Sequence, residues 1–158
     1  MSSGLRGLDR AEPFSYRQDT TVPGFPDDRP LIVFDGVCVL CSGFARFVVR
    51  QDRQAQFRFT AAQSPLGQSL FRHYGLETVN YETNLLLVDG RAFGKLAAVG
   101  GIMRRLGGWW RLAGVLRFVP PGIGNWLYDR VARNRYRLFG RSETCIVPSA
   151  DWRDRMIG

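Results

Sequence analysis

Apolar and polar positions in the first hundred residues repeat with two different periods, which predicts a mixture of strands and helices. Residues 31–34 form an uninterrupted apolar run, typical of a strand buried on both faces. Residues 56–60 alternate polar and aromatic side chains, as a second strand would. Between these segments, apolar residues recur at helical spacing over 39–51. This strand–helix–strand order predicts a right-handed βαβ unit with parallel strands.

The chain after this unit predicts a helix, a hairpin and a further helix. A Ser-Pro pair at 64–65 is a helix-start signal. Residues 83–88 and 91–94 are expected to be strands, because the Asp-Gly dipeptide between them favours a tight hairpin turn. An apolar stripe over 95–106 predicts a helix that covers the sheet.

The resulting order, βαβ followed by αββα, is the minimal thioredoxin arrangement. It predicts a thioredoxin-like α/β fold, in which a four-stranded mixed sheet is flanked by helices. Resemblance to the thioredoxin fold implies the strand order 2-1-3-4. Residues 109–118 and 122–139, separated by two prolines, predict further helices that form a C-terminal extension.

The two ends of the chain lack the pattern of the core. Residues 1–29 carry charges throughout and no continuous apolar stretch, so we interpret them as a flexible leader and not as a secretory signal. The strongly apolar run 112–116 is far shorter than the roughly 20 residues that span a bilayer, so no transmembrane helix is expected. The expected organisation is a leader at 1–29, a thioredoxin-like core at 30–107, a basic helical extension at 108–148 packed on the same domain, and a tail at 149–158.

Two cysteines lie three residues apart where the first strand gives way to a helix. The spacing of Cys38 and Cys41 puts both sulfurs on one side of the first helical turn, close enough for a disulfide. Unpaired N–H groups at a helix start stabilise a thiolate, so the pKa of Cys38 is expected to lie below its ordinary value of about 8.5. Cys38 is therefore the predicted attacking sulfur, and Cys41, one turn inward, the resolving sulfur.

Asp35 ends the first strand three residues before Cys38. A carboxylate at the end of a buried strand costs free energy unless it has a partner or a task. One hypothesis is general acid–base work, in which Asp35 relays a proton to the Cys41 thiolate when it leaves. The other is that Asp35 caps the helix that begins two or three residues later.

Residues 34–41, Phe-Asp-Gly-Val-Cys-Val-Leu-Cys, closely resemble the signature of the DCC family of thiol-disulfide oxidoreductases, named for its Asp-x-x-Cys-x-x-Cys motif. Residues 59–65, the hairpin at 86–90 and residues 134–141 before Cys145 resemble later blocks of that family. The resemblance covers residues 30 to about 148. It implies a thioredoxin-like fold with Asp35, Cys38 and Cys41 as the functional trio.

The activity expected from this resemblance is exchange of a Cys38–Cys41 dithiol or disulfide with a protein or a low-molecular-weight thiol. We expect an upstream electron donor such as a thioredoxin or glutathione system, and no cofactor. Three cysteines are too few and odd in number for a secreted disulfide framework, so the expected compartment is the cytoplasm. One departure is the loop at 80–82, which has no proline where thioredoxins place a cis-proline beside the active site.

A structural zinc site is the main alternative to redox chemistry. Cys38, Cys41, Cys145 and His73 could together supply four zinc ligands. A single Cys-x-x-Cys with two distant partners is a weak metal signal. The sequence therefore favours the redox interpretation and leaves the metal site as its alternative.

Positive charge is concentrated in the second part of the chain. Residues 1–100 hold 11 basic and 10 acidic side chains, whereas residues 101–158 hold 11 basic and 4 acidic ones. On the helix expected at 122–139, arginines and apolar residues are predicted on opposite sides, with tryptophans close by. The arginines are Arg130, Arg133, Arg137 and Arg141, the apolar residues Ile123, Leu127 and Val131, and the tryptophans Trp109, Trp110 and Trp126.

Two interpretations of this basic amphipathic segment stay open. It could rest on an anionic lipid surface or on an acidic partner. It could also be a solvated arginine face over an aromatic core patch, as in many soluble domains. No nucleic-acid-binding motif accompanies the charge, so nucleic acid is not an expected partner.

Overall fold

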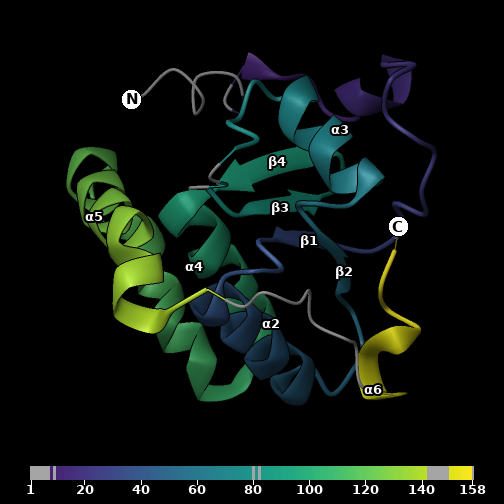
Figure 1. Cartoon of the computed structure of the whole chain (residues 1–158). Helices are drawn as coiled ribbons and strands as arrows, with labels where there is room; N and C mark the ends of the chain where they lie inside the picture. The colour runs from purple at the N-terminus through teal and green to yellow at the C-terminus, as the bar shows by residue number, and fades with distance from the viewer. Residues whose placement is uncertain (1–7, 9, 80, 82, 142–149, 158) are drawn as a thin grey trace.

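Four short strands form one mixed sheet at the centre of the computed structural model (Figure 1). Strand β1 (Leu31–Phe34) pairs in parallel with β2 (Arg58–Ala61) and antiparallel with β3 (Leu85–Val88), which pairs antiparallel with β4 (Arg91–Gly94). The strand order β2-β1-β3-β4 confirms the order expected from the sequence. The structure describes all residues except 1–7, 9, 80, 82, 142–149 and 158.

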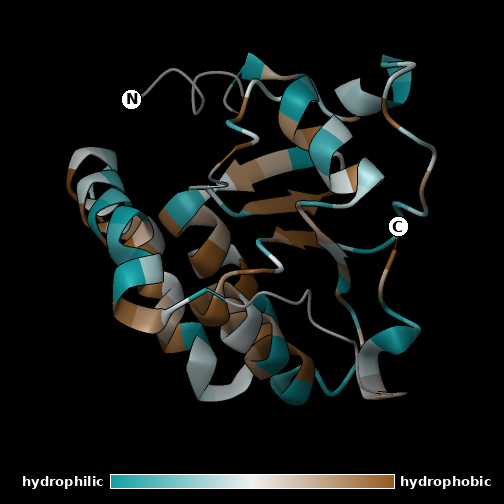
Figure 2. Cartoon of the chain, in the orientation of Figure 1, coloured by the Kyte–Doolittle hydropathy of each residue, from teal (hydrophilic) through white to brown (hydrophobic). Residues whose placement is uncertain are grey.

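Helices cover both faces of this sheet because successive strand residues point to opposite sides. Helix α3 (Pro65–His73) packs on one face, where Leu70 contacts a cluster that includes Leu31 and Val33 of β1. Helices α2 (Val39–Gln51) and α4 (Lys95–Leu106) pack on the other face, against a cluster that includes Ile32 and Phe34. Figure 2 shows the apolar strands enclosed between these layers. The unbroken apolar run of β1 follows from burial on both sides.

Two strands are shorter than the sequence predicts because polar contacts end the sheet pairing. The backbone N–H groups of Gln56 and Phe57 donate to the carboxylate of Asp52 at 3.2 and 3.0 Å, so β2 begins only at Arg58. Before β3, the N–H group of Asn84 donates to a tyrosine hydroxyl of the C-terminal helix. The predicted second and third strands are otherwise confirmed.

The C-terminal part of the chain contains a long 3-10 helix and a long α-helix. The 3-10 helix η2 (Gly108–Phe118) begins at two glycines, Gly107 at its N-cap and Gly108, whose φ values of 76° and 57° turn the chain away from α4. Helix α5 (Pro121–Phe139) lies beside α4 and α2 (Figure 1). The sequence predicted helices at both places, and the first is of the tighter 3-10 type. No helix among the described residues is long and apolar enough to cross a membrane.

Both ends of the described chain pack against the core. The 3-10 helix η1 (Ser15–Gln18) buries Tyr16, and Val22 joins the cluster beneath α3. This packing differs from the flexible leader expected at 1–29. At the other end, Trp152 of α6 (Ala150–Arg153) is 2% exposed and stacks on Phe34.

The end of the chain also covers the outer edge of β2. The N–H group of Phe59 donates to the carbonyl of Arg155 at 2.9 Å, and the N–H group of Ile157 donates to the carbonyl of Phe59 at 2.8 Å. These bonds satisfy backbone groups that an edge strand would otherwise expose.

Close approach of α3 to β2 depends on a glycine. A Cβ at Gly67 would lie 2.2 Å from the carbonyl oxygen of Ala61 and 2.8 Å from Cα of Ala62, so Gly67→Ala is expected to destabilise the protein by about 3 kcal/mol or more. Gly43, exposed on α2, is the matched control, because a methyl group added there would meet no atom within 4 Å. Gly43→Ala should stabilise the protein by about 0.5–1 kcal/mol, because alanine favours a helix. Urea unfolding of both variants measures these changes, and equal effects would contradict the close approach.

Candidate active site

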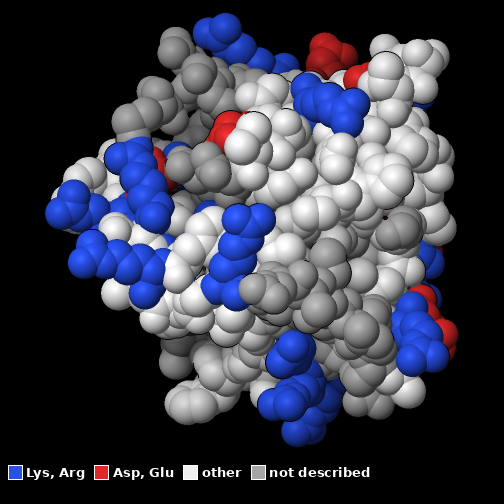
Figure 3. Space-filling model, viewed as in Figure 1, with Lys and Arg blue, Asp and Glu red and all other residues white. Residues whose placement is uncertain are grey.

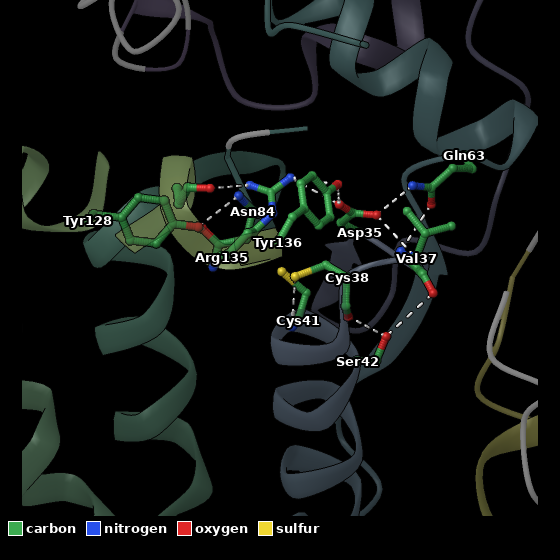
Figure 4. Close-up of polar contacts among 12 residues, drawn as sticks. Asp35, Val37, Cys38, Cys41, Ser42, Gln63, Asn84, Tyr128, Arg135 and Tyr136 are labelled. Carbon is green, nitrogen blue, oxygen red and sulfur yellow. Dashed lines mark hydrogen bonds and ion pairs between the residues drawn. The ribbon is translucent and has the colours of Figure 1, made fainter. Parts of the chain in front are cut away.

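Cys38 and Cys41 lie at the start of α2, as the sequence predicts. Cys38 is the N-cap residue, and its sulfur accepts a hydrogen bond from the backbone N–H group of Cys41 at 3.4 Å. Ser42 secures the same turn, because its hydroxyl and its N–H group both donate to the carbonyl of Cys38. Both cysteines are free thiols, and Figure 4 shows their sulfur atoms side by side. The helix start therefore holds two thiols within reach of each other.

The two thiols differ strongly in acidity. A hydrogen bond from the Cys41 thiol lowers the pKa of Cys38 to about 6, against the opposing effect of burial. The Cys41 backbone N–H group and the positive charge of Arg135 lower the Cys38 pKa further. The same sulfur–sulfur hydrogen bond, burial and the negative charge of Cys38 raise the pKa of Cys41. Near neutral pH this arrangement favours a thiolate at Cys38 and a thiol at Cys41.

Exposure of the two cysteines does not follow the expected order. Cys38 is 0% exposed, whereas Cys41, predicted to lie further inward, is only partly buried. The backbone of Cys38 forms an isolated antiparallel β-bridge with Arg141, just after α5. The C-terminal part of the chain therefore passes directly beside the predicted nucleophile, which a local sequence pattern could not indicate.

Asp35 is enclosed by hydrogen-bond donors from three parts of the chain. Its Oδ1 atom accepts from the N–H group of Val37 at 3.0 Å and from Nε2 of Gln63 at 2.6 Å. Its Oδ2 atom accepts from Nη2 of Arg135 at 3.0 Å and from the hydroxyl of Tyr136 (Figure 4). The side chains of Asp35 and Arg135 are 1% and 4% exposed, so this ion pair is buried.

These contacts bear on both hypotheses for Asp35. The bond to the Val37 N–H group is a local turn contact just before the helix, similar to capping. Within the described part of the chain, neither cysteine sulfur is a hydrogen-bond partner of the carboxylate. Both carboxylate oxygens are occupied by donors, and the ion pair with Arg135 joins the end of β1 to α5.

Helix α5 supplies polar residues that the sequence analysis did not assign to the site. Arg135 and Tyr136 bind Asp35, and the hydroxyl of Tyr128 donates to Oδ1 of Asn84 at 3.1 Å. The buried face of α5 carries Gly124, Ala132 and Arg135. Gly124, Tyr128, Ala132 and Arg135 follow one another at spacings of four, four and three, which is the periodic signal that could have identified this face.

The apolar side of α5 is open to solvent. Ile123, Leu127 and Val131 are 62%, 53% and 39% exposed. They therefore do not form the aromatic core patch that one interpretation of this helix required. The helix is instead attached through its third face and through an ion pair between Lys95 and Asp129 at 2.6 Å.

The predicted zinc ligands do not come together among the described residues. His73 forms hydrogen bonds through both ring nitrogens, to the Ser15 hydroxyl at 2.8 Å and to the Asp19 carboxylate at 2.7 Å. It thus links α3 to the N-terminal segment and does not face the cysteines. Cys145 lies outside the described residues. Within the described ranges, no group of three or more His, Cys, Asp or Glu side chains could hold a metal ion.

Comparison with known proteins shows which family the sequence resembles. The sequence model of the DCC1-like thiol-disulfide oxidoreductases matches residues 32–141. The chain is 35% identical over 127 residues to the uncharacterized protein YuxK of Bacillus subtilis, covering 80% of this chain and 93% of that protein. It is 39% identical over 120 residues to a chloroplastic DCC family protein of Arabidopsis thaliana, covering 75% and 70% of the two chains. No solved structure gives a significant match.

The buried pair of Asp35 and Arg135 generates a stability prediction. Asp35→Asn and Arg135→Gln each leave one buried charge without its partner, so each is expected to cost about 3–5 kcal/mol. The double variant should lose less than the sum of the two, because it leaves neither charge behind. Urea unfolding of the four proteins measures this coupling.

Arg17→Gln is the control for the loss of an ion pair at the surface. Arg17 is 57% exposed where it meets Asp27, so its loss should cost at most about 1 kcal/mol. Strictly additive effects of Asp35→Asn and Arg135→Gln would contradict a direct coupling between the two buried groups.

Proposed function

Since the chain belongs to the DCC1-like thiol-disulfide oxidoreductase family, we propose that Cys38 and Cys41 are its redox-active pair. One observation carries this proposal: two thiols of opposite acidity lie side by side in the first turn of α2. A thiolate is the nucleophile in disulfide exchange, and a thiol one turn along can resolve the intermediate. The substrates we propose are proteins or low-molecular-weight compounds that carry thiols or disulfides.

The reaction proceeds in two exchanges. The Cys38 thiolate attacks one sulfur of the substrate disulfide, the substrate S–S bond breaks, and one substrate sulfur leaves and takes up a proton. Cys41 then loses its proton and attacks the Cys38 sulfur, which releases the second substrate sulfur as a thiol. The protein ends as the Cys38–Cys41 disulfide, and the substrate has gained two electrons and two protons.

Regeneration of the dithiol needs two electrons from a thiol donor of the thioredoxin or glutathione type. The presence of only three cysteines in the chain suits a reducing compartment such as the cytoplasm, where such donors are abundant. The same two exchanges run in reverse if the pair oxidises its substrate.

Arg135 acts in this proposal as the charge that stabilises the thiolate. An arginine stays protonated at every physiological pH, so its charge is permanent. It lowers the pKa of both cysteines, and Asp35 and Tyr136 hold its guanidinium in place. Asp35 is then a positioning residue, and its own negative charge keeps the Cys38 pKa from falling further.

Acidity and exposure favour different cysteines as the sulfur that attacks the substrate. Cys41 is the more exposed sulfur, but a thiol whose pKa is raised is a poor nucleophile near neutral pH. We therefore assign the attack to Cys38. Cys38 is 0% exposed, so its sulfur must become accessible before it can meet a substrate.

The redox assignment predicts a specific disulfide. Equilibration of the protein with mixtures of reduced and oxidised glutathione, followed by acid quenching and mass spectrometry, should show a Cys38–Cys41 disulfide that rises with the oxidised fraction. Cys41→Ser should accumulate a mixed disulfide with glutathione at Cys38, because the resolving thiol is missing. Cys38→Ser should react more slowly, since burial still raises the pKa of the remaining Cys41 after the interactions with Cys38 are lost.

Cys145→Ser is the control, and it should leave the Cys38–Cys41 disulfide unchanged. Absence of that disulfide over the whole series would refute the proposal. So would stoichiometric zinc whose removal unfolds the chain, because it would establish the metal site instead.

The thiolate predicts a pH profile. In a Cys145→Ser background, the far-ultraviolet thiolate absorbance of the reduced protein should titrate with a midpoint near pH 6, the lowered pKa of Cys38. The folded pKa lies below that of an unfolded thiol, about 8.5, so Cys38 stabilises the fold fully above pH 8.5. That contribution is lost as the pH falls through 6, so the melting temperature of the reduced protein should fall between about pH 8.5 and pH 6. Above about pH 8.5 the raised pKa of Cys41 acts in the opposite direction.

Substitutions test how much the charge of Arg135 contributes to the lowered pKa of Cys38. Arg135→Gln should raise the midpoint, because a positive charge is removed, whereas Arg135→Lys should keep it near pH 6. Asp35→Asn should lower it, since a negative charge near Cys38 is removed. Arg137→Gln, at an exposed position of the same helix, should not move it. A wild-type midpoint near 8.5 would contradict the assigned nucleophile.

A further inference from the structure

Four large apolar side chains form an exposed row on η2, which we call the η2 ridge. Its members are Trp109, Leu112, Val115 and Phe118, which are 75%, 73%, 60% and 70% exposed. They are spaced by three residues, and a 3-10 helix has three residues per turn, so their side chains lie in line along one side of η2. An α-helix of the same sequence would spread them around its surface.

The opposite side of η2 attaches this helix to the rest of the protein. The indole N–H group of Trp110 donates to Oε1 of Gln51 at 3.3 Å, and its ring packs edge-on against Phe47 at 4.9 Å between centroids. A Cβ at Gly114 would lie 3.3 Å from the side chain of Arg104, so η2 approaches α4 closely. The fold is thus held without the ridge, which turns outward.

The surroundings of the ridge are strongly basic. Apart from Arg135, which is buried with Asp35, residues 96–141 contain eight arginines and a single acidic residue, Asp129, which is paired with Lys95. Arg104 and Arg111 line one hollow together with Leu112, Val115 and Phe118. Figure 3 shows further basic side chains over the neighbouring helix α5. An apolar row beside unbalanced positive charge is complementary to an apolar layer with an anionic surface.

We propose that the η2 ridge rests on an anionic lipid membrane. The four ridge side chains would enter the boundary between headgroups and acyl chains, to a depth of about 5–10 Å, while Arg104 and Arg111 bind lipid phosphates. Tryptophan at one end of the ridge is typical of this boundary region. A second copy of the chain fits less well, because it would bring the same positive charge against itself.

The proposal is independent of the redox pair, so its test does not use thiol chemistry. The reduced full-length protein is sedimented with vesicles of phosphatidylcholine, alone or mixed with phosphatidylglycerol. Binding should be strong only with the anionic mixture and should weaken as salt is added, because phosphate contacts are screened. Exposed Trp109 should shift its fluorescence to shorter wavelength on binding, as its ring leaves water.

Matched variants separate the apolar and the charged contributions. Leu112→Ser with Val115→Ser should weaken binding at least about tenfold, because two apolar side chains no longer enter the membrane. The double substitution Arg104→Gln with Arg111→Gln removes two positive charges and should reduce the salt dependence of vesicle binding. Glutamine at position 104 keeps the Cβ and Cγ atoms of Arg104, which lie close to Gly114. Val79→Ser is the control, since Val79 is 79% exposed on the loop after α3. Circular dichroism and melting temperature should be unchanged in all three.

Three results would overturn the proposal. One is failure of the wild-type protein to bind anionic vesicles at low salt. The second is binding that Leu112→Ser with Val115→Ser leaves unchanged, which would place the contact elsewhere. The third is a dimer in analytical ultracentrifugation that this double variant dissociates, because the ridge would then serve contact between two copies.

Discussion

The buried ion pair of Asp35 and Arg135 joins the end of the first strand to the last long helix, 100 residues further along the chain. Neither charge could stay in this place alone, because the free energy of removing it from water would not be offset. Val37, Gln63 and Tyr136 complete the hydrogen bonding of the carboxylate. The position of α5 and the electrostatic environment of the two thiols therefore depend on the same contact.

Local sequence patterns were sufficient to predict the four strands and helices α2 to α5 of this fold. The apolar run of β1, the Asp-Gly turn between β3 and β4 and the apolar stripe of α4 each depend on residues close in the chain. The position of Cys38 and Cys41 at the start of α2 was likewise predicted from residues close to them in the chain. The strand order required the resemblance to the thioredoxin fold, since hydrophobic periodicity does not identify neighbouring strands.

Contacts between distant segments are what the sequence could not supply. Periodicity indicated two faces of α5, one basic and one apolar, but both are exposed, and the third face carries Arg135. Arg135 stands among other arginines, and only its spacing from Gly124, Tyr128 and Ala132 indicates that it belongs to the buried face. Cys38 likewise forms a backbone bridge with Arg141, which lies far away in the sequence. The N-terminal segment packs on the core because Tyr16 is buried beneath α3. Such outcomes are set by tertiary partners, which propensity and spacing do not describe.

The sequence separation of the site residues has a consequence during synthesis on the ribosome. Chains emerge from their N-terminus, so Cys38 and Cys41 are made long before Arg135. Until α5 has docked, Cys38 lacks the positive charge of Arg135 that lowers its pKa. The pKa of Cys38 therefore reaches its final value only after the last long helix of the chain has been made and has docked.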